Sequence, residues 1–275
     1  MNPYKQKVER QFNRAASTYD RYADIQREMA DRLLKQVDLL NPPPRRILEI
    51  GCGTGYLTKR VTHAYPDATI VAVDLAASMV RSAREHVSES KRVRFLVGDA
   101  ETMDFHAYAP FDCILSNAAV QWFSQPGETL ARLAEAVSPG GWLWFTTFGP
   151  ETFVELNRLF HEVESRMGLA RSRHTLPLSP SSEWRRLFDE AGLSSVRVRS
   201  FRRSVIYSDC RHFLRSIQKI GASYGTSPHP PLQSGRLLAE VIRQYDQRHR
   251  TEDGVQVTYQ WLLMGGMKSG RKRIP

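Results

Sequence analysis

Short apolar runs that alternate with helically spaced segments organise residues 45–150. The first run, Ile47–Ile50, leads into three alternating glycines, and beyond them Tyr56, Leu57 and Val61 share one helical face. A strand, a tight turn and a helix in this order are typical of the opening of a parallel α/β sheet. The pattern predicts seven strands, at residues 47–50, 68–74, 92–99, 111–117, 142–148, 196–206 and 255–264.

The segments outside these strands have helical spacing. Apolar residues from Val8 to Val37 recur at three- and four-residue steps, which predicts one or two amphipathic helices that end before Asn41–Pro44. Tyr19 and Gln26 put polar groups on that inward stripe, so we expect the segment to fold over a ligand cleft. The inserts 151–180 and 208–250 are too long for plain loops and predict a helical lid. Within the second insert, 208–221 has helical spacing with Asp209 as its N-cap.

These boundaries divide the chain into three parts. Residues 1–44 form an N-terminal helical segment over the cleft, and 45–150 form the ligand-binding core. Residues 151–275 supply the rest of the sheet and the lid inserts. We therefore expect an α/β, Rossmann-like sheet with N-terminal helices and a helical lid.

The glycine-rich turn indicates the class of ligand. Gly51, Gly53 and Gly55 allow positive φ and let backbone N–H groups approach a ligand closely. Asp74 ends the second strand 19 residues after Gly55, where a carboxylate can accept both hydroxyls of a ribose. The sequence therefore predicts a nucleoside-bearing ligand at the carboxyl edge of the sheet.

The spacing G-x-G-x-G, with Glu49 two positions upstream, differs from the dinucleotide fingerprint G-x-G-x-x-G. A carboxylate beside the loop suits a cationic amino acid better than a pyrophosphate, although an ordinary dinucleotide-binding sheet stays the alternative. The pattern resembles the first motifs of the S-adenosylmethionine-dependent methyltransferases of class I. That resemblance implies that the loop passes under the methionine part and that Asp74 holds the ribose. It further implies cofactor contacts from the residues at the later strand ends, namely Leu75, Met79, Asp99, Ala100 and Asn117.

Composition and charge narrow the location and the partners. The chain of 275 residues has no run of about 18 apolar residues and no secretion signal, so we expect no membrane span and a cytoplasmic location. Its three widely spaced cysteines and scattered histidines predict reduced thiols and no metal site. Residues 1–150 hold 18 Lys and Arg against 17 Asp and Glu, whereas 151–275 hold 21 against 12. This excess, which includes a cluster at residues 268–273, favours a negatively charged partner such as nucleic acid or an acidic carrier protein.

Several longer motifs together resemble one family, the malonyl-carrier-protein O-methyltransferases of biotin synthesis. The resemblance runs from about residue 6 to about residue 268. Ala118 and residues 149–152 depart from the pattern, and the second departure affects the lid. The residues that carry the resemblance are Phe12-x-x-Ala15-Ala16-x-x-Tyr19 with Gln26, Leu48–Gly55, Ser116–Trp122, Phe145–Thr147 with Glu155-Leu156, Arg215–Ala222 and Val257–Tyr259.

The resemblance implies transfer of a methyl group from S-adenosylmethionine to the free carboxylate of malonyl, with S-adenosylhomocysteine as product. The malonyl group is carried by an acidic acyl-carrier protein or by coenzyme A, and its methyl ester starts pimeloyl assembly. A carboxylate is ionised at neutral pH and needs no general base. Arg215 is the candidate that recognises it. Tyr19, Gln121 and Trp122 would line the reaction chamber, and Gln26 and Glu49 would meet the cofactor.

Three alternatives stay open. The chain could methylate another small carboxylate or a quinone precursor. It could methylate RNA, which would explain its charge, but it lacks an Asn-Pro-Pro-Tyr-type motif and a separate RNA-binding module, so we expect no nucleic-acid partner. It could also bind the cofactor without catalysis. The oligomeric state is left open, with a monomer favoured.

Overall fold

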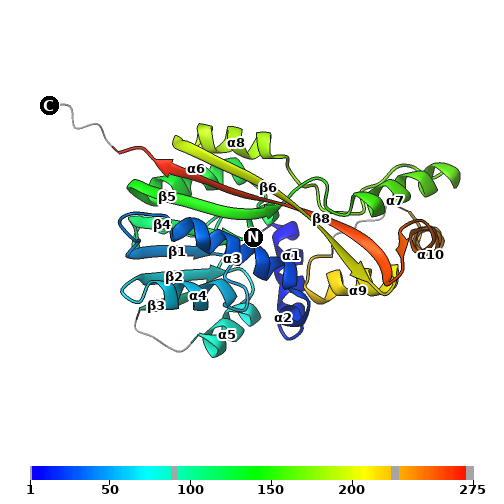
Figure 1. The fold of residues 1–275 in the computed structure, drawn as a ribbon, viewed down its shortest axis with the longest axis horizontal. Coiled ribbons are helices and arrows are strands. Elements are labelled where there is room, and N and C mark those ends of the chain that lie inside the picture. Colours follow the sequence, from blue (N-terminus) through cyan, green and yellow to red (C-terminus); the bar gives the residue numbers. More distant parts are fainter. Residues whose placement is uncertain (1, 88–91, 224–228, 271–275) are drawn as a thin grey trace.

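A twisted sheet runs through the centre of the protein (Figure 1). The computed structural model describes residues 2–87, 92–223 and 229–270. Along the sheet the strand order is β3-β2-β1-β4-β5-β8-β6, with β7 paired to the start of β8. The strands are β1 Arg46–Ile50, β2 Thr69–Asp74, β3 Val93–Val97, β4 Phe111–Asn117, β5 Val137–Phe148, β6 Leu193–Tyr207, β7 Arg250–Thr251 and β8 Gly254–Lys268.

The sheet is parallel from β3 to β5 and antiparallel at β8 and β6. Parallel strands need crossover connections, whereas the antiparallel β8 enters between β5 and β6. The α/β, Rossmann-like fold predicted from the sequence is confirmed. The prediction of seven strands omitted β7, a two-residue strand that forms a tight hairpin with β8, with Thr251 opposite Gly254.

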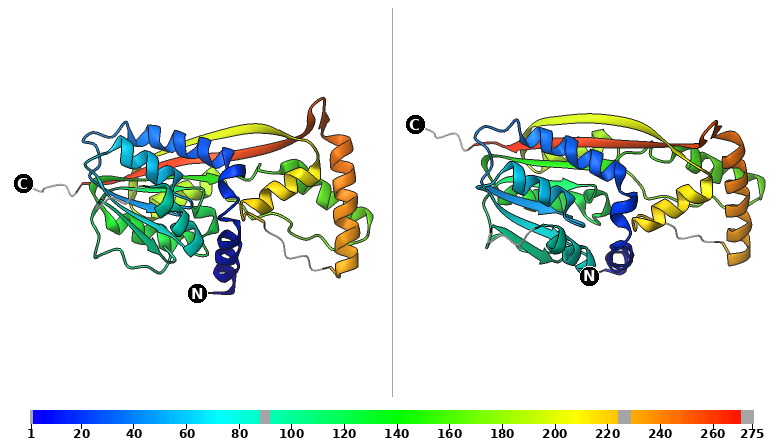
Figure 2. Two further views of the ribbon diagram at one scale, coloured as in Figure 1. Left: turned by 90° about the horizontal axis from the view of Figure 1, so that it is seen from below. Right: turned by 60° about the horizontal axis from the view of Figure 1, so that its bottom comes forward.

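Helices cover both faces of the sheet, because its strands are apolar on both sides. One face is covered by α3, α4 and α5 and the other by α6 and α8, each packed on its own hydrophobic cluster (Figures 1 and 2). The ranges of these helices are α3 Asp24–Val37, α4 Tyr56–Ala64, α5 Ala77–His86, α6 Pro126–Ala136 and α8 Ser181–Glu190.

Strands β6 and β8 extend beyond the parallel part of the sheet and support a second group of helices. β5 pairs with β8 only between Trp261 and Met267, whereas β6 follows β8 as far as Val255. At this extension lie α7 Val154–Arg166, α9 Cys210–Lys219 and α10 Pro231–Arg248 (Figure 2). The side chain of Asp209 accepts a hydrogen bond from the backbone N–H of His212 at 2.7 Å and so caps α9 as expected.

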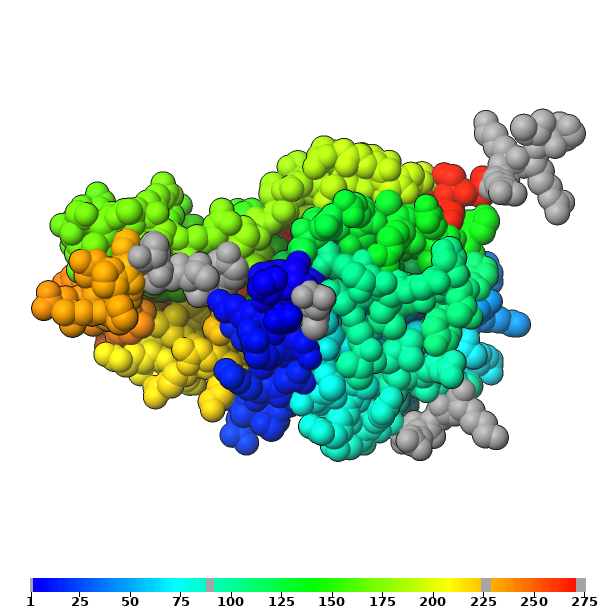
Figure 3. Space-filling view, turned by 180° about the vertical axis from the view of Figure 1, so that it is seen from behind, coloured from blue at the N-terminus to red at the C-terminus, as the bar shows by residue number. Residues whose placement is uncertain are grey.

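The N-terminal segment lies between the parallel sheet and these outer helices (Figure 3). Helix α1 Pro3–Ala15 is capped by Asn2, whose side chain accepts a hydrogen bond from the Lys5 N–H at 2.8 Å. A short helix, α2 Tyr19–Tyr22, then leads into α3. Three helices therefore form where the spacing predicted one or two, since the chain bends twice before α3.

Two sequence features lie partly outside the described residues. Residues 224–228 belong to the second insert, and residues 271–273 make up most of the last basic cluster. Among the described helices, none combines the length and apolarity needed to span a membrane.

Candidate functional site

The turn after β1 is held by Asp74 at the end of β2. The backbone N–H of Gly53 donates to one Asp74 oxygen at 2.9 Å, and the N–H of Ala76 donates to the other at 2.8 Å. Burial raises the pKa of Asp74, while these N–H groups act in the opposite direction. Each oxygen keeps a further lone pair, so the carboxylate can hold the loop and still accept hydroxyl groups.

Two glycines of this turn have different roles. Gly51 has a φ of +73°, and a Cβ there would lie 2.3 Å from the Cβ of Ala119, so a larger residue would strain the loop. Gly55 was predicted to bind the cofactor, but it lines none of the cavities described below. A Cβ at Gly55 would lie 3.0 Å from the backbone of Ala83, so this glycine lets α4 approach α5 closely. The structure thus gives Gly55 a packing role, and its expected contact with the cofactor stays a prediction.

Glu49, two positions before Gly51, is the buried carboxylate of the loop. Its Oε2 has no hydrogen-bond partner among the described residues, and only 2% of the residue is exposed. Burial, with a smaller contribution from the nearby Asp74 charge, raises the pKa of Glu49 to about 8. A buried carboxylate of this kind needs a compensating cation or donor. The residue therefore fits the ammonium group of an amino acid placed beside the glycines.

A narrow cavity follows the carboxyl edge of the parallel strands, and we call it the cleft. It has a volume of about 90 Å³ and is lined by residues from the ends of β1, β2 and β4 and from α1. The residues expected at the nucleoside part of a cofactor all line it, namely Asp74, Leu75, Met79, Asp99 and Ala100. A smaller cavity of about 30 Å³, which we call the loop cavity, lies beside Glu49 and Gln26. Gly51, Gly53 and Asn117 line both.

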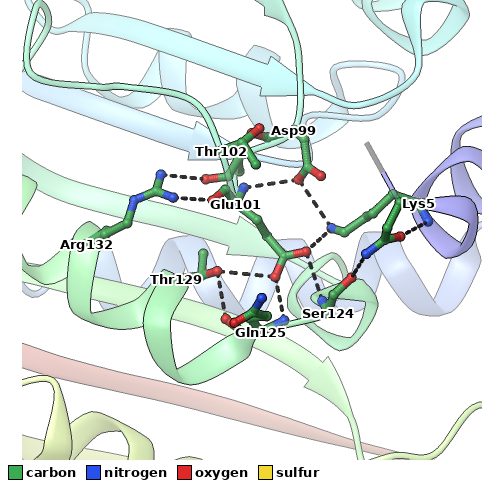
Figure 4. Close-up of polar contacts among 10 residues, drawn as sticks. Lys5, Asp99, Glu101, Thr102, Ser124, Gln125, Thr129 and Arg132 are labelled. Carbon is green, nitrogen blue, oxygen red and sulfur yellow. Dashed lines mark hydrogen bonds and ion pairs between the residues drawn. The ribbon is translucent and has the colours of Figure 1, made fainter.

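A charged cluster closes the cleft where α1 meets the end of β3 (Figure 4). The ammonium of Lys5 lies 2.5 Å from a Glu101 oxygen and 3.3 Å from Asp99, and only 4% of Lys5 is exposed. Burial alone would raise the pKa of Glu101, but hydrogen bonds from Lys5 and from the N–H groups of Ser124 and Gln125 lower it. Lys5, Val8 and Phe12 place one face of α1 along the cleft. The N-terminal helix is therefore an ion-paired wall of the site.

A much larger cavity, which we call the chamber, lies between the sheet edge and the outer helices. Its volume is about 370 Å³ and its walls are mostly apolar and aromatic. No Lys or Arg belongs to the described residues that line it. Its outer wall comes from α7, the segment 174–178, α9 and α10, represented by Phe160, His174, Leu176, Phe213 and Leu238.

Tyr19 lies where the three cavities meet. It lines the cleft, the loop cavity and the chamber, so its side chain borders both halves of a cofactor and the space for a second substrate. Burial, followed by the charge of Asp74, raises the pKa of the Tyr19 phenol well above its ordinary value. The hydroxyl therefore stays protonated at neutral pH and can donate a hydrogen bond.

Gln26, Asn117, Gln121 and Trp122 surround this junction. The Asn117 amide donates to the Gln26 backbone carbonyl at 3.0 Å and accepts from the Thr146 hydroxyl at 2.6 Å. The Gln121 amide donates to the Ala118 carbonyl at 2.7 Å, and its oxygen accepts from Thr147 at 3.1 Å. Gln121 and Trp122 line the chamber, Trp122 also lines the cleft, and Gln26 lines both the chamber and the loop cavity. These residues are fixed by hydrogen bonds or burial before any ligand binds.

The geometry contradicts the position expected for Arg215. Its side chain is exposed on α9 and lines none of the described cavities, whereas Phe213, Leu214 and Ile217 of the same helix face the chamber. Residues 213, 214 and 217 share the face of the helix that lines the chamber. Residue 215 lies on the solvent-exposed side, so its side chain is directed away from the chamber. Arg215 is therefore not placed to bind a carboxylate inside the chamber.

The sequence analysis missed three features of the site. Lys5 precedes Val8 by three residues on the inward stripe of α1, and a lysine in that register was a usable signal. Phe12, named in the sequence analysis only as part of the family resemblance, lines both the cleft and the chamber and packs edge-on against Trp122. His174 lines the chamber beside Phe160 and lies 2.7 Å from the buried Glu164, and no local pattern pointed to it.

Comparisons with known proteins agree with this geometry. A family model described as a methyltransferase domain matches residues 47–141. A malonyl-[acyl-carrier protein] O-methyltransferase of Paenibacillus sp. (strain JDR-2) is 38% identical over 273 residues, which cover 96% of this chain and 99% of that protein. The protein of the same name from Bacillus anthracis is 32% identical over 96% of this chain and 98% of its own length.

Solved structures show the same fold at lower identity. A putative methyltransferase from Bacillus halodurans C-125 superposes with a TM-score of 0.60 at 18% identity, covering 87% of this chain and 98% of the other. Magnesium protoporphyrin IX methyltransferase from Synechocystis PCC 6803, solved with bound S-adenosylhomocysteine, gives a TM-score of 0.58 at 14% identity. That superposition covers 97% of this chain and 100% of the other. At these identities the structural likeness concerns the fold alone.

Proposed function

Because this chain belongs to the malonyl-[acyl-carrier protein] O-methyltransferase family, we propose that it transfers the methyl group of S-adenosylmethionine to the free carboxylate of malonyl-acyl-carrier protein. The product would be the malonyl methyl ester, whose masked carboxylate lets apolar chain elongation proceed toward pimeloyl in biotin synthesis. S-adenosylhomocysteine would be the second product.

The observation that carries this proposal is the convergence of three cavities on Tyr19. In the proposed complex the adenosine occupies the cleft, with Asp74 on the ribose, Asp99 and Ala100 at the adenine edge, and Leu75 and Met79 against its faces. The methionine part occupies the loop cavity beside Gly51, Gly53 and Asn117, and Glu49 and Gln26 meet its ammonium group. The malonyl group enters from the chamber, so donor and acceptor meet at Tyr19.

S-adenosylmethionine supplies an electrophilic methyl group on a positively charged sulfur. The protein's own task is alignment, since a carboxylate with an ordinary pKa near 4 is already ionised and needs no base. The Tyr19 hydroxyl, protonated at neutral pH as any phenol is, donates to one carboxylate oxygen and leaves the other free to attack. The second N–H of the Gln121 amide offers a further donor, because its first is engaged by Ala118. Trp122 and Phe12 close the junction against water.

The absence of Lys and Arg from the described lining of the chamber suits this chemistry. A cation inside the chamber would stabilise the ground-state carboxylate, whose charge is lost as the ester forms. The charge of the methyl donor itself can attract the carboxylate. We infer that neutral donors orient the malonyl group and that the apolar walls exclude water.

The partner and the location are inferred from charge and thiol chemistry. The excess of basic residues in 151–275 suits an acidic carrier protein, and malonyl-coenzyme A is the alternative acceptor. The three cysteines are free and buried, as expected of a protein in the reducing cytoplasm.

Methyl transfer to several acceptors in parallel tests the proposal. Purified protein would be given S-adenosylmethionine labelled in the methyl group, together with malonyl-carrier protein, malonyl-coenzyme A or bulk RNA. We expect label in an alkali-labile ester on at least one malonyl thioester and none on RNA. Failure on both malonyl thioesters, or label on RNA alone, would contradict the assignment.

A further inference from the structure

Helix α9 has two faces of opposite character. Phe213, Leu214, Ile217 and Ile220 face the chamber and form part of its wall. Arg211, Arg215 and Lys219 are exposed and recur at four-residue steps, so they form one row along the outer side. One helix thus separates the apolar chamber from solvent and carries a line of positive charge outside.

This row runs beside the entrance of the chamber. Of the described residues that line the chamber, Gln218 on α9 and Leu238 on α10 are exposed, and we call these two the rim. Gln218 directly precedes Lys219 and lies one turn after Arg215, so it stands at the edge between the chamber face of the helix and the cationic row. A ligand that reaches the chamber past the rim therefore passes the cationic row.

Two arginines of the neighbouring helix α10 are ion-paired, whereas the three cations of the row are not. Arg243 of α10 binds Glu240 at 2.6 Å, and Arg248 binds Glu162 at 2.6 Å. Within the described part of the chain, no carboxylate lies within ion-pair distance of Arg211, Arg215 or Lys219. Asp209, the N-cap of the helix, accepts a hydrogen bond from the His212 N–H, and the Arg215 charge acts on this carboxylate only from a greater distance. Three unneutralised cations in one row at an entrance favour an acidic partner.

The row is also connected to the transfer junction. The backbone carbonyl of Lys219 accepts a hydrogen bond from the Thr18 hydroxyl at 2.7 Å, and Thr18 directly precedes Tyr19. Gly221 packs against α1, where a Cβ would lie 3.1 Å from the Gln11 carbonyl oxygen. Figure 3 shows α9, in yellow, on the surface beside the blue N-terminal helices. A partner that docks on α9 therefore lies next to the segment that carries Tyr19.

We propose that the outer face of α9, formed by Arg211, Arg215 and Lys219, is the docking surface for an acidic face of the acyl-carrier protein, which delivers its thioester arm past Gln218 and Leu238. This inference rests on the proposed function and adds to it the place where the carrier binds. It also gives Arg215 a new role, since the residue meets the carrier protein and not the malonyl carboxylate.

Charge reversal on α9 tests the proposal with two acceptors. The double variant Arg211→Glu/Lys219→Glu and the single variant Arg215→Glu would be assayed with malonyl-carrier protein and with malonyl-N-acetylcysteamine, a small carrier-free thioester whose only charge is the malonyl carboxylate. With the carrier protein we expect KM to rise at least about tenfold at low salt for the double variant, with kcat unchanged, because charge pairs at an interface act mainly on encounter and affinity. With the carrier-free thioester we expect kcat and KM to stay within about twofold of the original protein.

The matched control is Arg185→Glu, because Arg185 is an exposed arginine of α8, which Figure 1 places far from α9. It changes the net charge as Arg215→Glu does and should leave both acceptors unaffected. Circular dichroism and the melting temperature would show that each variant is folded.

A direct measurement of carrier binding tests this proposal independently of the proposed methyl transfer. Binding of dye-labelled carrier protein would be followed by fluorescence anisotropy. We expect it to bind the original protein with an affinity that falls as salt is added, and to bind the double variant at least about tenfold less tightly. This result is expected even if no methyl transfer is seen with any acceptor. Unchanged carrier binding by the double variant would overturn the proposal. The proposal would also be overturned if Arg215→Glu lost as much activity on the carrier-free thioester as on the carrier protein. The same holds if the double variant lost RNA binding and not carrier binding.

Discussion

The cofactor half and the lid half of this protein recognise their ligands in different ways. Between Glu49 and Asn117, backbone N–H groups and carboxylates converge on two narrow cavities, and Asp74 holds the loop through the Gly53 N–H with one oxygen and accepts from the Ala76 N–H with the other. Between Phe153 and Tyr259, aromatic and aliphatic side chains form most of the wall of a chamber of about 370 Å³, and no described Lys or Arg lines it. In the proposed complex, specific polar contacts bind the donor, whereas exclusion of water inside and charge outside serve the acceptor. Substitutions in the two halves should therefore have different kinetic consequences.

The largest effect is expected from Asp74→Ala, which removes the anchor of the glycine turn and the proposed ribose contact. Two hydrogen bonds to a charged group are lost, at about 1.5–3 kcal/mol each. We expect affinity for S-adenosylmethionine, measured by calorimetry, to fall at least about a hundredfold. The control Asp67→Ala changes an exposed carboxylate just before β2 and should bind normally. Turnover at the original rate in Asp74→Ala would show that the loop does not hold the donor.

The next effect concerns the junction of the two halves. Tyr19→Phe removes one donor to the carboxylate, and a hydrogen bond to a charged group is worth about 1.5–3 kcal/mol, so kcat should fall about 10- to 100-fold. Cofactor affinity should change little, because the ring still fills the junction. Tyr22→Phe in the same short helix is the matched control, since Tyr22 lines none of the described cavities. Equal kcat values for Tyr19→Phe and Tyr22→Phe would show that the Tyr19 hydroxyl takes no part in the reaction.

A smaller effect is expected where α1 closes the cleft. Lys5→Met leaves Asp99 and Glu101 without their shared cation, which should lower the free energy of unfolding by about 3 kcal/mol in urea titrations. Arg10→Met, on the exposed side of α1, should cost less than about 0.5 kcal/mol.

The same pair predicts a pH dependence. The folded-state pKa of Glu101 is lowered, so the contribution of its ion pair is fully present above the ordinary pKa of a glutamate. It is lost as the pH falls through the lowered folded-state value. The stability difference between the original protein and Lys5→Met should therefore be constant near neutrality and shrink in acid. A difference that grows in acid would contradict the pairing.

The smallest expected effect is the release of a proton from Glu49 when the cofactor binds. Because the pKa of Glu49 is raised to about 8 without ligand, its carboxyl is mostly protonated at pH 7. If a ligand ammonium pairs with it, binding must release most of one proton. Calorimetry in buffers of different ionisation enthalpy should detect this release in the original protein and its absence in Glu49→Gln. Equal proton release by the two proteins would show that Glu49 does not pair with the ligand ammonium group.

The difference between the halves also explains what could be predicted from the sequence. The cofactor half depends on local motifs, so Glu49, Gly51, Gly53 and Asp74 were found and line the expected cavities. The packing role of Gly55 was not predicted, because a packing glycine and a ligand glycine look alike in a short motif. The positions of the parallel strands were predictable because each is a short apolar run between helically spaced segments.

The lid half depends on how separate elements meet. The helix 208–221 was predicted well, but its register against the chamber was not, so Arg215 was placed inside when it lies outside. His174 lies in a segment without periodicity and reaches the chamber only through packing on Phe160 and Glu164. Lys5 could have been found, since a lysine on the buried stripe of α1 required an acidic partner.

A crystal structure of the protein with S-adenosylhomocysteine and a malonyl thioester tests the central claim most directly. We predict that the malonyl carboxylate lies beside the sulfur atom, within hydrogen-bond distance of the Tyr19 hydroxyl and with no Lys or Arg in contact. A carboxylate bound to an arginine, or a thioester that reaches the sulfur by a route outside the chamber, would contradict the account.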